Sequence, residues 1–250
     1  MTQFDKRNLS MMMDFYEMTM SYGYFHQGRG DVCVAFDLFF RAVPDKGGYA
    51  VFAGLEHVIE FVENLSFSDD DIAYFRAQNL FSEEFLTFLR KFRFRGDIYA
   101  VPEGTIIYPD EPLMTIVAPI IDAQLIETAV LAQINHQSLI ATKASRIVRA
   151  AEGRMVSDFG ARRAHNMDAA TYGARAAYIG GVDMTATVSA GQQFGIPISG
   201  TMAHSWVMFF EDELTAFKHY AEIYPQATVL LVDTYDVIRS GIPNAILTAR

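Results

Sequence analysis

The sequence predicts an α/β protein, on three observations. Short apolar runs alternate with helical patterns after Gly153, residues 32–53 and 97–121 carry strand patterns broken by turns, and one long helical pattern links these parts. Strands that alternate with helices imply right-handed crossovers and a parallel sheet, either open or closed into a barrel. The region after Gly153 holds too few candidate strands to close a barrel, which takes eight.

The composition fits a soluble protein of a reducing compartment. The 250 residues are 51% hydrophobic, which is enough to bury a sizeable core. The formal net charge of −10 argues against nucleic acid or an anionic membrane as the main partner, because both attract basic surfaces. The single cysteine, Cys33, excludes an internal disulfide framework, and there is no apolar signal core or run long enough to span a bilayer. We therefore expect a cytoplasmic protein with no nucleic-acid or membrane partner.

The first elements are predicted to be a short helix and a strand. Residues 11–26 place apolar side chains at helical spacing, and their many methionines and tyrosines are most simply a packing face. Asp14-Phe15-Tyr16 in this helix is a weak functional signal by itself. Residues 32–40 predict a strand buried on both faces, and Pro-Asp-Lys-Gly-Gly at 44–48 predicts a turn.

Three short helices are expected next, at residues 54–64, 68–78 and 82–92. Ser68 and Ser82 stand at the start of the last two, each followed by acidic residues that suit a helix N-terminus. Four cations close the third helix, and we interpret them as a solvated helix end without a ligand: Arg90, Lys91, Arg93 and Arg95. Residues 97–121, punctuated by proline and glycine, predict strands and turns that form a β-rich domain with residues 32–53.

One long helix is predicted from Asp122 to about Gly153. The polar run Asn135-His136-Gln137-Ser138 interrupts its apolar stripe, and it is either a satisfied buried network or a wall of a site. Both readings stay open. The predicted domains are an N-terminal α+β domain over residues 1–121 and an α/β part over residues 122–250.

The second half alternates strands and helices. We expect strands at 154–159, 196–201 and 228–232, a short strand or turn at 181–183, and helices at 167–178, 185–194, 212–224 and from Tyr235 onward. In a parallel α/β fold the C-terminal ends of the strands carry the chemistry. The polar residues at these ends are Asp158, Arg162, Arg163, Asp183, Thr201, His204, Asp233 and Thr234.

Two of these strand ends stand out chemically. In an acidic chain the adjacent Arg162 and Arg163 suit a carboxylate or a phosphate, with a surface ion pair as the alternative. His204 is the one nucleophile candidate that stands out, and it could accept a phosphoryl group or act as an acid or base. The alternative is a core or capping histidine, but the small residues and hydroxyls in Gly200-Thr201-Met202-Ala203-His204-Ser205 leave it little apolar surface to pack against. No phosphate-loop, CxxC or HExxH motif is present. The residues alone therefore indicate an α/β enzyme that acts on a small anionic, phosphorylated substrate.

Several stretches resemble the nicotinate phosphoribosyltransferase family, in the order in which that family carries them. They include Asp14-Phe15-Tyr16-Glu17-Met18-Thr19-Met20 and Ser157-Asp158-Phe159-Gly160-Ala161-Arg162-Arg163, together with residues 103–105, 127–138, 177–181 and 194–205. The resemblance implies an irregular α/β barrel, partial in this chain, with an N-terminal β-rich α+β domain. It also implies a homodimer with sites shared between subunits.

The activity implied by the resemblance is transfer of a phosphoribosyl group from 5-phosphoribosyl 1-pyrophosphate (PRPP) to nicotinate. The products would be nicotinate mononucleotide and pyrophosphate, in NAD biosynthesis, with ATP hydrolysis coupled through a phosphohistidine. Mg²⁺ would accompany ATP and PRPP, and no metal held tightly by protein ligands is expected.

The resemblance also implies roles for single residues. Phe159 would stack on the pyridine ring, with Tyr16 of the other subunit on the opposite face. Arg162 and Arg163 would hold the carboxylate or a phosphate, and His204 would receive the phosphoryl group of ATP. Asp183 and Thr201 would line the substrate pocket, Asp233 and Thr234 would lie near a phosphate, and Ala186 would replace the Asp of nicotinamide-using relatives.

Family members are longer than this chain, and the segments that hold the ribose and the 5-phosphate are expected outside it. Two alternatives therefore stand beside the enzyme. One is a truncated, non-catalytic homologue that acts as a partner subunit. The other is a quinolinate phosphoribosyltransferase, which would release carbon dioxide and need no ATP.

Overall fold

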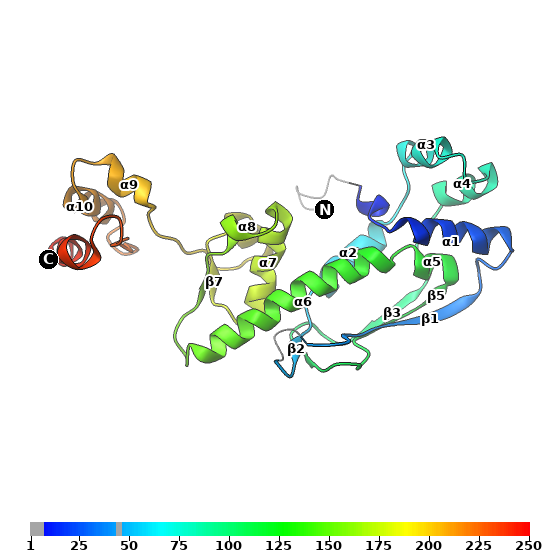
Figure 1. Cartoon of the computed structure of the whole chain (residues 1–250), viewed down its shortest axis with the longest axis horizontal. Coiled ribbons are helices and arrows are strands. Elements are labelled where there is room, and N and C mark those ends of the chain that lie inside the picture. The colour runs from blue at the N-terminus through cyan, green and yellow to red at the C-terminus, as the bar shows by residue number, and fades with distance from the viewer. Residues whose placement is uncertain (1–7, 44–46) are drawn as a thin grey trace. The chain divides into compact units, whose positions relative to one another are not determined.

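A computed structural model describes residues 8–43 and 47–250 (Figure 1). Residues 44–46, at the head of the predicted turn, lie outside the described residues, as do residues 1–7. The chain forms two compact units, Met1–Pro197 and Ile198–Arg250. The predicted domain boundary at residue 121 stays a prediction. Every helix within the described ranges is too short or too polar to cross a lipid bilayer.

The first unit begins with an antiparallel sheet of three strands. Strand β5 (Met114–Pro119) lies between β1 (Cys33–Leu38) and β3 (Asp97–Ala100). A second, two-stranded sheet pairs β2 (Ala50–Val51) with β4 (Ile106–Ile107). The expectation that residues 32–40 are buried on both faces is wrong, because β1 is an edge strand whose residues alternate between more and less exposed positions. Antiparallel sheets can leave one face to solvent in this way.

Four helices accompany this sheet: α1 (Phe15–His26), α2 (Leu55–Asn64), α3 (Asp69–Ala77) and α4 (Glu83–Arg90). The predicted caps are confirmed. Ser68 forms a capping box with Asp71, and the Ser82 hydroxyl accepts the Phe85 N–H. Aromatic rings fasten α1 to α4, with the ring centroids of Tyr22 and Phe85 5.2 Å apart.

The basic cluster after α4 is only partly a solvated helix end. An Arg95 guanidinium nitrogen donates to Asp122 at 2.9 Å, and the Asp122 side chain is fully buried. A buried carboxylate needs a partner of this kind, because ionised groups lose their hydration on burial. Arg95 therefore holds the segment between α4 and β3 against the short helix that contains Asp122.

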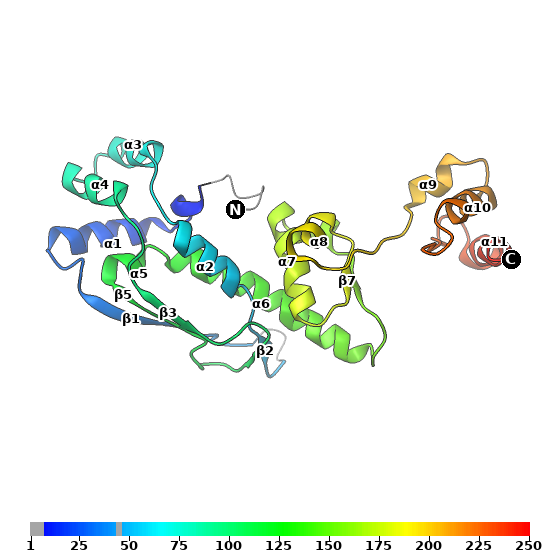
Figure 2. The same cartoon turned by 180° about the vertical axis from the view of Figure 1, so that it is seen from behind.

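The predicted helix from Asp122 to Gly153 is two helices, α5 (Ile120–Gln124) and α6 (Glu127–Ala150). Helix α6 runs from the sheet at its first turns to α7 at its last turns (Figures 1 and 2). Its polar run forms a buried network. The Ser138 hydroxyl accepts the Ala53 N–H at 3.0 Å and donates to the Ala53 carbonyl at 3.1 Å, and Gln137 donates to His57 Nδ1 at 3.1 Å. These bonds support the network interpretation for Gln137 and Ser138, although the buried Gln137 Oε1 has no hydrogen-bond partner among the described residues. Asn135 instead lines a pocket, as the other interpretation expects.

Gly54, just before α2, is required by the backbone. Its φ is +107°, which L residues with a side chain rarely adopt, and a Cβ there would lie 2.9 Å from the Gln133 carbonyl oxygen. The glycine lets α2 begin directly against α6.

The rest of the first unit is the start of an α/β arrangement. Strands β6 (Ser157–Asp158) and β7 (Met184–Thr185) pair in parallel, with α7 (Met167–Ile179) between them in sequence and α8 (Val188–Phe194) after them. Of the two alternatives expected for residues 181–183, the structure has a turn at Gly181, whose φ is +99°, and the strand β7 begins only at Met184. The chain is thus a mixed α/β structure, and the described residues contain no closed barrel.

The second unit is helical, with α9 (His204–Phe209), α10 (Glu213–Ile223), a π-helical turn (Val237–Gly241) and α11 (Ile242–Thr248). Its core includes buried Val207 and Phe217, with Trp206 donating its indole N–H to the Ala216 carbonyl at 3.0 Å. The strands expected at 196–201 and 228–232 are wrong. Neither segment forms a ladder among the described residues. Segment 196–201 has only an isolated bridge residue, Ile198, beside the bond from the Thr185 N–H to the Pro197 carbonyl at 3.0 Å.

Candidate functional site

The end of β6 turns sharply into a loop that exposes an aromatic ring. The Asp158 carboxylate oxygen Oδ1 accepts the Gly160 N–H at 2.9 Å, which is an Asx turn. This turn leaves Phe159 51% exposed, although phenylalanine is usually buried. A flat apolar ring on the surface at the end of a parallel strand is suited to stack on a planar ligand.

Two exposed guanidinium groups follow the ring. Arg162 and Arg163 lie in the short 3-10 helix Ala161–Arg163 and are both exposed. Neither forms an ion pair with any residue that the structure describes, so the surface ion pair considered from the sequence is absent from this part of the chain. Unpaired guanidinium groups suit a carboxylate or a phosphate, which they bind through paired hydrogen bonds. Residues 158–163 are called the 158–163 loop below.

The adjoining strand carries the predicted Asp183 and the backbone around it. The Asp183 carboxylate accepts the Val156 N–H at 2.8 Å, and its own N–H donates to the Val156 carbonyl at 2.9 Å. The Ala186 N–H donates to the Asp158 carbonyl at 2.8 Å. The fold therefore brings Asp183 and Ala186 to the same strand pair that carries the 158–163 loop.

Two residues of this region had no role assigned from the sequence. Asp158 was placed at a strand end only, and Thr185 was counted as the first residue of a helix. The structure joins them, with the Thr185 hydroxyl donating to Asp158 Oδ2 at 2.9 Å. The Asp-x-Gly pattern at 158–160 is an Asx-turn signal that points to the first of these residues. The long-range bond to Thr185 has no sequence signal.

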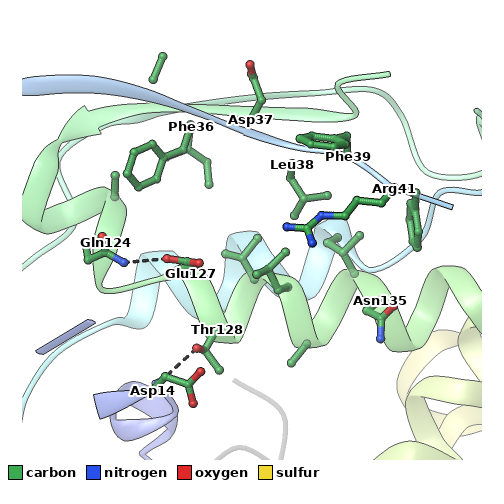
Figure 3. A pocket seen from close by; sticks show the side chains of 18 of the residues that line it. Asp14, Phe36, Asp37, Leu38, Phe39, Arg41, Gln124, Glu127, Thr128 and Asn135 are labelled. Carbon is green, nitrogen blue, oxygen red and sulfur yellow. Dashed lines mark hydrogen bonds between the residues drawn. The ribbon is translucent and has the colours of Figure 1, made fainter. Parts of the chain in front are cut away.

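Tyr16 lies in a different part of the first unit. It lines an open pocket of about 1050 Å³ between β1 and the first half of α6, and no residue of the 158–163 loop lines that pocket (Figure 3). Partial burial and the nearby Glu127 carboxylate raise the pKa of Tyr16 to about 12. The phenol is protonated at neutral pH, as a tyrosine with the ordinary pKa of about 10 also is, and Tyr16 is 43% exposed.

The start of α1 is fastened to the start of α6 beside this pocket. The Asp14 N–H donates to the Thr128 hydroxyl at 3.2 Å, a bond drawn in Figure 3, and the Thr128 N–H donates to buried Glu17 at 2.9 Å. Burial raises the pKa of Glu17. These bonds fix where Tyr16 stands on the surface.

The remaining predicted residues belong to the second unit. His204 opens α9, and its Nε2 lies 3.0 Å from Asp233 Oδ1. Both side chains are more than half exposed, at 54% and 58%, so the pair is accessible to a ligand. The Thr201 hydroxyl donates to the Met202 carbonyl at 2.9 Å. The Thr234 hydroxyl oxygen is buried and has no hydrogen-bond partner among the described residues.

A protein-held metal was also considered. Within residues 8–43 and 47–250, no three His, Cys, Asp or Glu side chains gather where they could hold one ion. His204 is close to one carboxylate, that of Asp233, and the two do not belong to a group of three such side chains among the described residues.

Comparison with protein families finds two matches. Residues 11–135 match the nicotinate phosphoribosyltransferase N-terminal domain, and residues 155–243 match the nicotinate phosphoribosyltransferase family. Among curated proteins, a nicotinate phosphoribosyltransferase of Mycobacterium tuberculosis is 48% identical over 96% of this chain and 51% of its own length. That of Bacillus subtilis is 48% identical over 99% of this chain and 50% of its own length. The chain thus spans about half the length of these relatives.

Two solved structures are similar as well. Human nicotinic acid phosphoribosyltransferase is 30% identical with a TM-score of 0.86, over 94% of this chain and 57% of that one. The nicotinate-nucleotide pyrophosphorylase of Pyrococcus furiosus is 26% identical with a TM-score of 0.79, over 100% of this chain and 57% of that one.

Proposed function

The chain belongs to the nicotinate phosphoribosyltransferase family, and from that premise we propose that it supplies the pyridine-binding part of an enzyme that joins nicotinate to PRPP. In this reaction the lone pair of the pyridine nitrogen forms a bond to C1 of the ribose. The bond from C1 to pyrophosphate breaks, and pyrophosphate leaves with the electron pair. The products are nicotinate mononucleotide, an intermediate of NAD biosynthesis, and pyrophosphate.

The observation that carries this proposal is the chemistry of the 158–163 loop. Nicotinate is a flat ring with one carboxylate, and the loop offers an exposed Phe159 ring beside two unpaired guanidinium groups. Stacking would hold the ring, and Arg162 or Arg163 would bind the carboxylate or a substrate phosphate. Ala186, bonded to this loop through its N–H, adds no negative charge that would repel the carboxylate.

The second unit supports a coupling to ATP. In this proposal the Asp233 carboxylate holds the proton on one ring nitrogen of His204, which leaves the lone pair of the other to bond the γ-phosphorus of ATP. The bond from that phosphorus to the bridging oxygen breaks, and ADP leaves with the electron pair. Thr201 and Thr234 would lie near the phosphates. Mg²⁺ would arrive with the phosphates of ATP and PRPP, as part of these substrates.

We also propose an assembly and a location. The β6–β7 pair would belong to an irregular α/β barrel, and a homodimer would bring Tyr16 of one copy to the 158–163 loop of the other. The exposed ring of Tyr16, held on α1 away from its own loop, supports that arrangement. One exposed, unpaired cysteine, Cys33, agrees with a reducing cytoplasm.

Binding and turnover of labelled nicotinate by the purified chain test the proposal. Phe159→Leu should weaken nicotinate binding about fivefold, since aromatic contacts contribute about 1 kcal/mol. Arg162→Met should weaken it by at least about tenfold, because hydrogen bonds to charged groups are worth about 1.5–3 kcal/mol. Tyr74→Leu and Arg154→Met, which remove an exposed aromatic and an exposed cation elsewhere, are the matched controls and should leave binding unchanged.

The outcomes separate the alternatives. A wild-type chain that does not bind nicotinate would overturn the proposal. Binding without any release of pyrophosphate in the presence of PRPP and ATP would assign the chain to the partner-subunit reading instead. Release of carbon dioxide from quinolinate, without ATP, would indicate a quinolinate phosphoribosyltransferase instead.

The role of His204 has its own test. With ATP labelled in the γ-phosphate, wild-type protein should retain an acid-labile, alkali-stable label, and His204→Ala should retain none. Asp233→Asn should reduce the labelling, because an amide cannot hold the imidazole proton as a carboxylate does. Exposed His219→Ala on α10 is the control and should be labelled as wild type is. Retained label in His204→Ala would remove this residue from the mechanism.

A further inference from the structure

Asp158 is hydrogen-bonded to three separate segments of the candidate nicotinate site. Its side chain accepts the Gly160 N–H at 2.9 Å through Oδ1 and the Thr185 hydroxyl at 2.9 Å through Oδ2. Its main-chain carbonyl accepts the Ala186 N–H at 2.8 Å. One residue is therefore bonded to the turn behind Phe159, to β7, and to the segment that follows β7.

Thr185 continues this connection into α8. The side chain is 1% exposed, and its hydroxyl accepts the Thr187 N–H at 3.0 Å while donating to Asp158. Thr187 is the N-cap residue of α8. The hydroxyl of Thr185 thus links the 158–163 loop to the start of the next helix.

The geometry favours a structural role for the Asp158 carboxylate over a direct chemical one. Each of its oxygens accepts a hydrogen bond from the chain itself, one within the loop and one from β7. A general base or a ligand-binding carboxylate needs an oxygen directed at the ligand. The bonds instead determine where Phe159 and the 3-10 helix with Arg162 stand relative to Ala186.

We propose that Asp158 and Thr185 form a positioning pair that pre-orders the 158–163 loop for the pyridine acid, an inference that rests on the proposed function of that loop. Asp158 acts through Phe159 and Arg162, and touches no substrate atom itself. Pre-ordering a loop strengthens binding because the cost of fixing it is met during folding and not on association.

The test compares four variants in the full chain. Thr185→Val removes the hydroxyl at nearly constant volume, Thr185→Ser keeps it, and Asp158→Ala removes both side-chain bonds. Thr171→Val is the matched control, since Thr171 is also a buried threonine whose hydroxyl bonds Ser189 on α8, away from the loop. The measurements are nicotinate affinity and the rate of tryptic cleavage after Arg162 and Arg163 in the native protein.

We expect Thr185→Val and Asp158→Ala to weaken nicotinate binding about tenfold or more and to speed cleavage at Arg162 and Arg163 by a similar factor. In any turnover assay the KM for nicotinate should rise about tenfold while the KM for PRPP changes by less than about twofold. Thr185→Ser should restore wild-type behaviour, and Thr171→Val should match wild type in both measurements.

Loop cleavage at the wild-type rate in Thr185→Val and Asp158→Ala would overturn the inference. So would equal effects of Thr185→Val and Thr171→Val, because they would indicate general destabilisation. The cleavage readout needs no ligand. Faster cleavage in a chain whose wild type binds no nicotinate would support the positioning pair while counting against the proposed function.

Discussion

His57 shows how burial can fix the protonation state of one side chain. It is 5% exposed, its Nδ1 is bonded to Gln137, and its ring centroid lies 4.3 Å from that of Tyr172. Burial, and then the nearby Arg175 cation, lower its pKa, against the opposing effect of Glu56 and Glu103. The imidazole is therefore neutral in the folded protein at pH 7.

This environment predicts a pH dependence of stability. The unfolded state takes up a proton near the ordinary pKa of about 6.5, while folded His57 takes it up only at lower pH. Its contribution to stability is thus complete above about pH 6.5 and is lost as the pH falls toward the lowered pKa. Each unit of lowering corresponds to about 1.4 kcal/mol.

Urea unfolding of wild type and of His57→Gln between about pH 7.5 and 5 measures the effect. We expect the wild type to lose more stability than the variant over this range, because only the wild type must keep a buried imidazole neutral. The remaining titrating groups, His136 among them, are common to both proteins and cancel in the difference. Parallel stability curves would contradict the assignment.

At the scale of elements, the packing of α7 on α6 depends on a close approach at Gly180. A Cβ at this position would lie 2.4 Å from the Ala141 carbonyl oxygen and 2.8 Å from the Ala144 side chain. Both neighbours are held by the α6 backbone, so neither can move away easily. A Cβ added at Gly173, in the middle of α7, would instead make only an ordinary van der Waals contact, 3.9 Å from the His136 ring.

The two glycines predict opposite effects of the same substitution. Gly180→Ala should destabilise the chain by about 1–3 kcal/mol through overpacking. Gly173→Ala should stabilise it by about 0.5–1 kcal/mol, because alanine loses less conformational entropy in a helix. Urea unfolding of the two variants measures both. A neutral Gly180→Ala would mean that α6 and α7 are not packed as closely as these distances state.

Elements with local signals could be predicted from the sequence, and elements defined by distant partners could not. Helices α3 and α4 are marked by a serine cap with acids in the next turn, and both begin where that signal stands. The segments 196–201 and 228–232 have the apolar composition of strands, but a strand is defined by the ladder it forms with a neighbour. Helix α9 was missed because it is short and no side chain caps its start.

At the scale of the whole molecule, a buried ion pair joins distant parts of the first unit. Arg175 on α7 donates to both oxygens of Glu103, at 3.0 and 2.7 Å, and Glu103 also accepts the Leu55 N–H at 3.0 Å at the start of α2. Burial alone would raise the pKa of Glu103, but the bonds from Arg175 and the backbone outweigh it and hold the pKa below its usual value. The pair links the N-terminal helices to the helix that follows the 158–163 loop.

Breaking this ion pair should lower the free energy of unfolding by more than breaking a surface ion pair of the same geometry does. Arg175→Met should reduce the free energy of unfolding by about 3 kcal/mol, because it leaves the Glu103 carboxylate buried without its cation. Arg76→Met removes an exposed guanidinium that also bonds both oxygens of its partner, Glu83, and should leave stability unchanged within error. Equal effects in urea unfolding would show that burial adds nothing to the Arg175 pair.

The candidate site could be predicted in its chemistry but not in its support. Phe159 and the two arginines are contiguous, so the sequence itself brings an aromatic ring and cations together. The hydrogen bonds that hold them come from Thr185 and Ala186, which follow the loop in the sequence only after the whole of α7. His204 and Asp233 are likewise separated in sequence, and their 3.0 Å contact exists only in the folded second unit.

The position of the one tryptophan has a practical consequence. Trp206 is packed in the second unit, with its indole N–H bonded to Ala216, and the chain has no other tryptophan. Tryptophan fluorescence, excited at the long-wavelength edge of protein absorbance, therefore comes from Trp206 and reports on residues 198–250 alone. Far-ultraviolet circular dichroism instead averages over all helices. If the two optical signals melt at different denaturant concentrations, the units unfold independently; coincident curves would indicate a single cooperative transition.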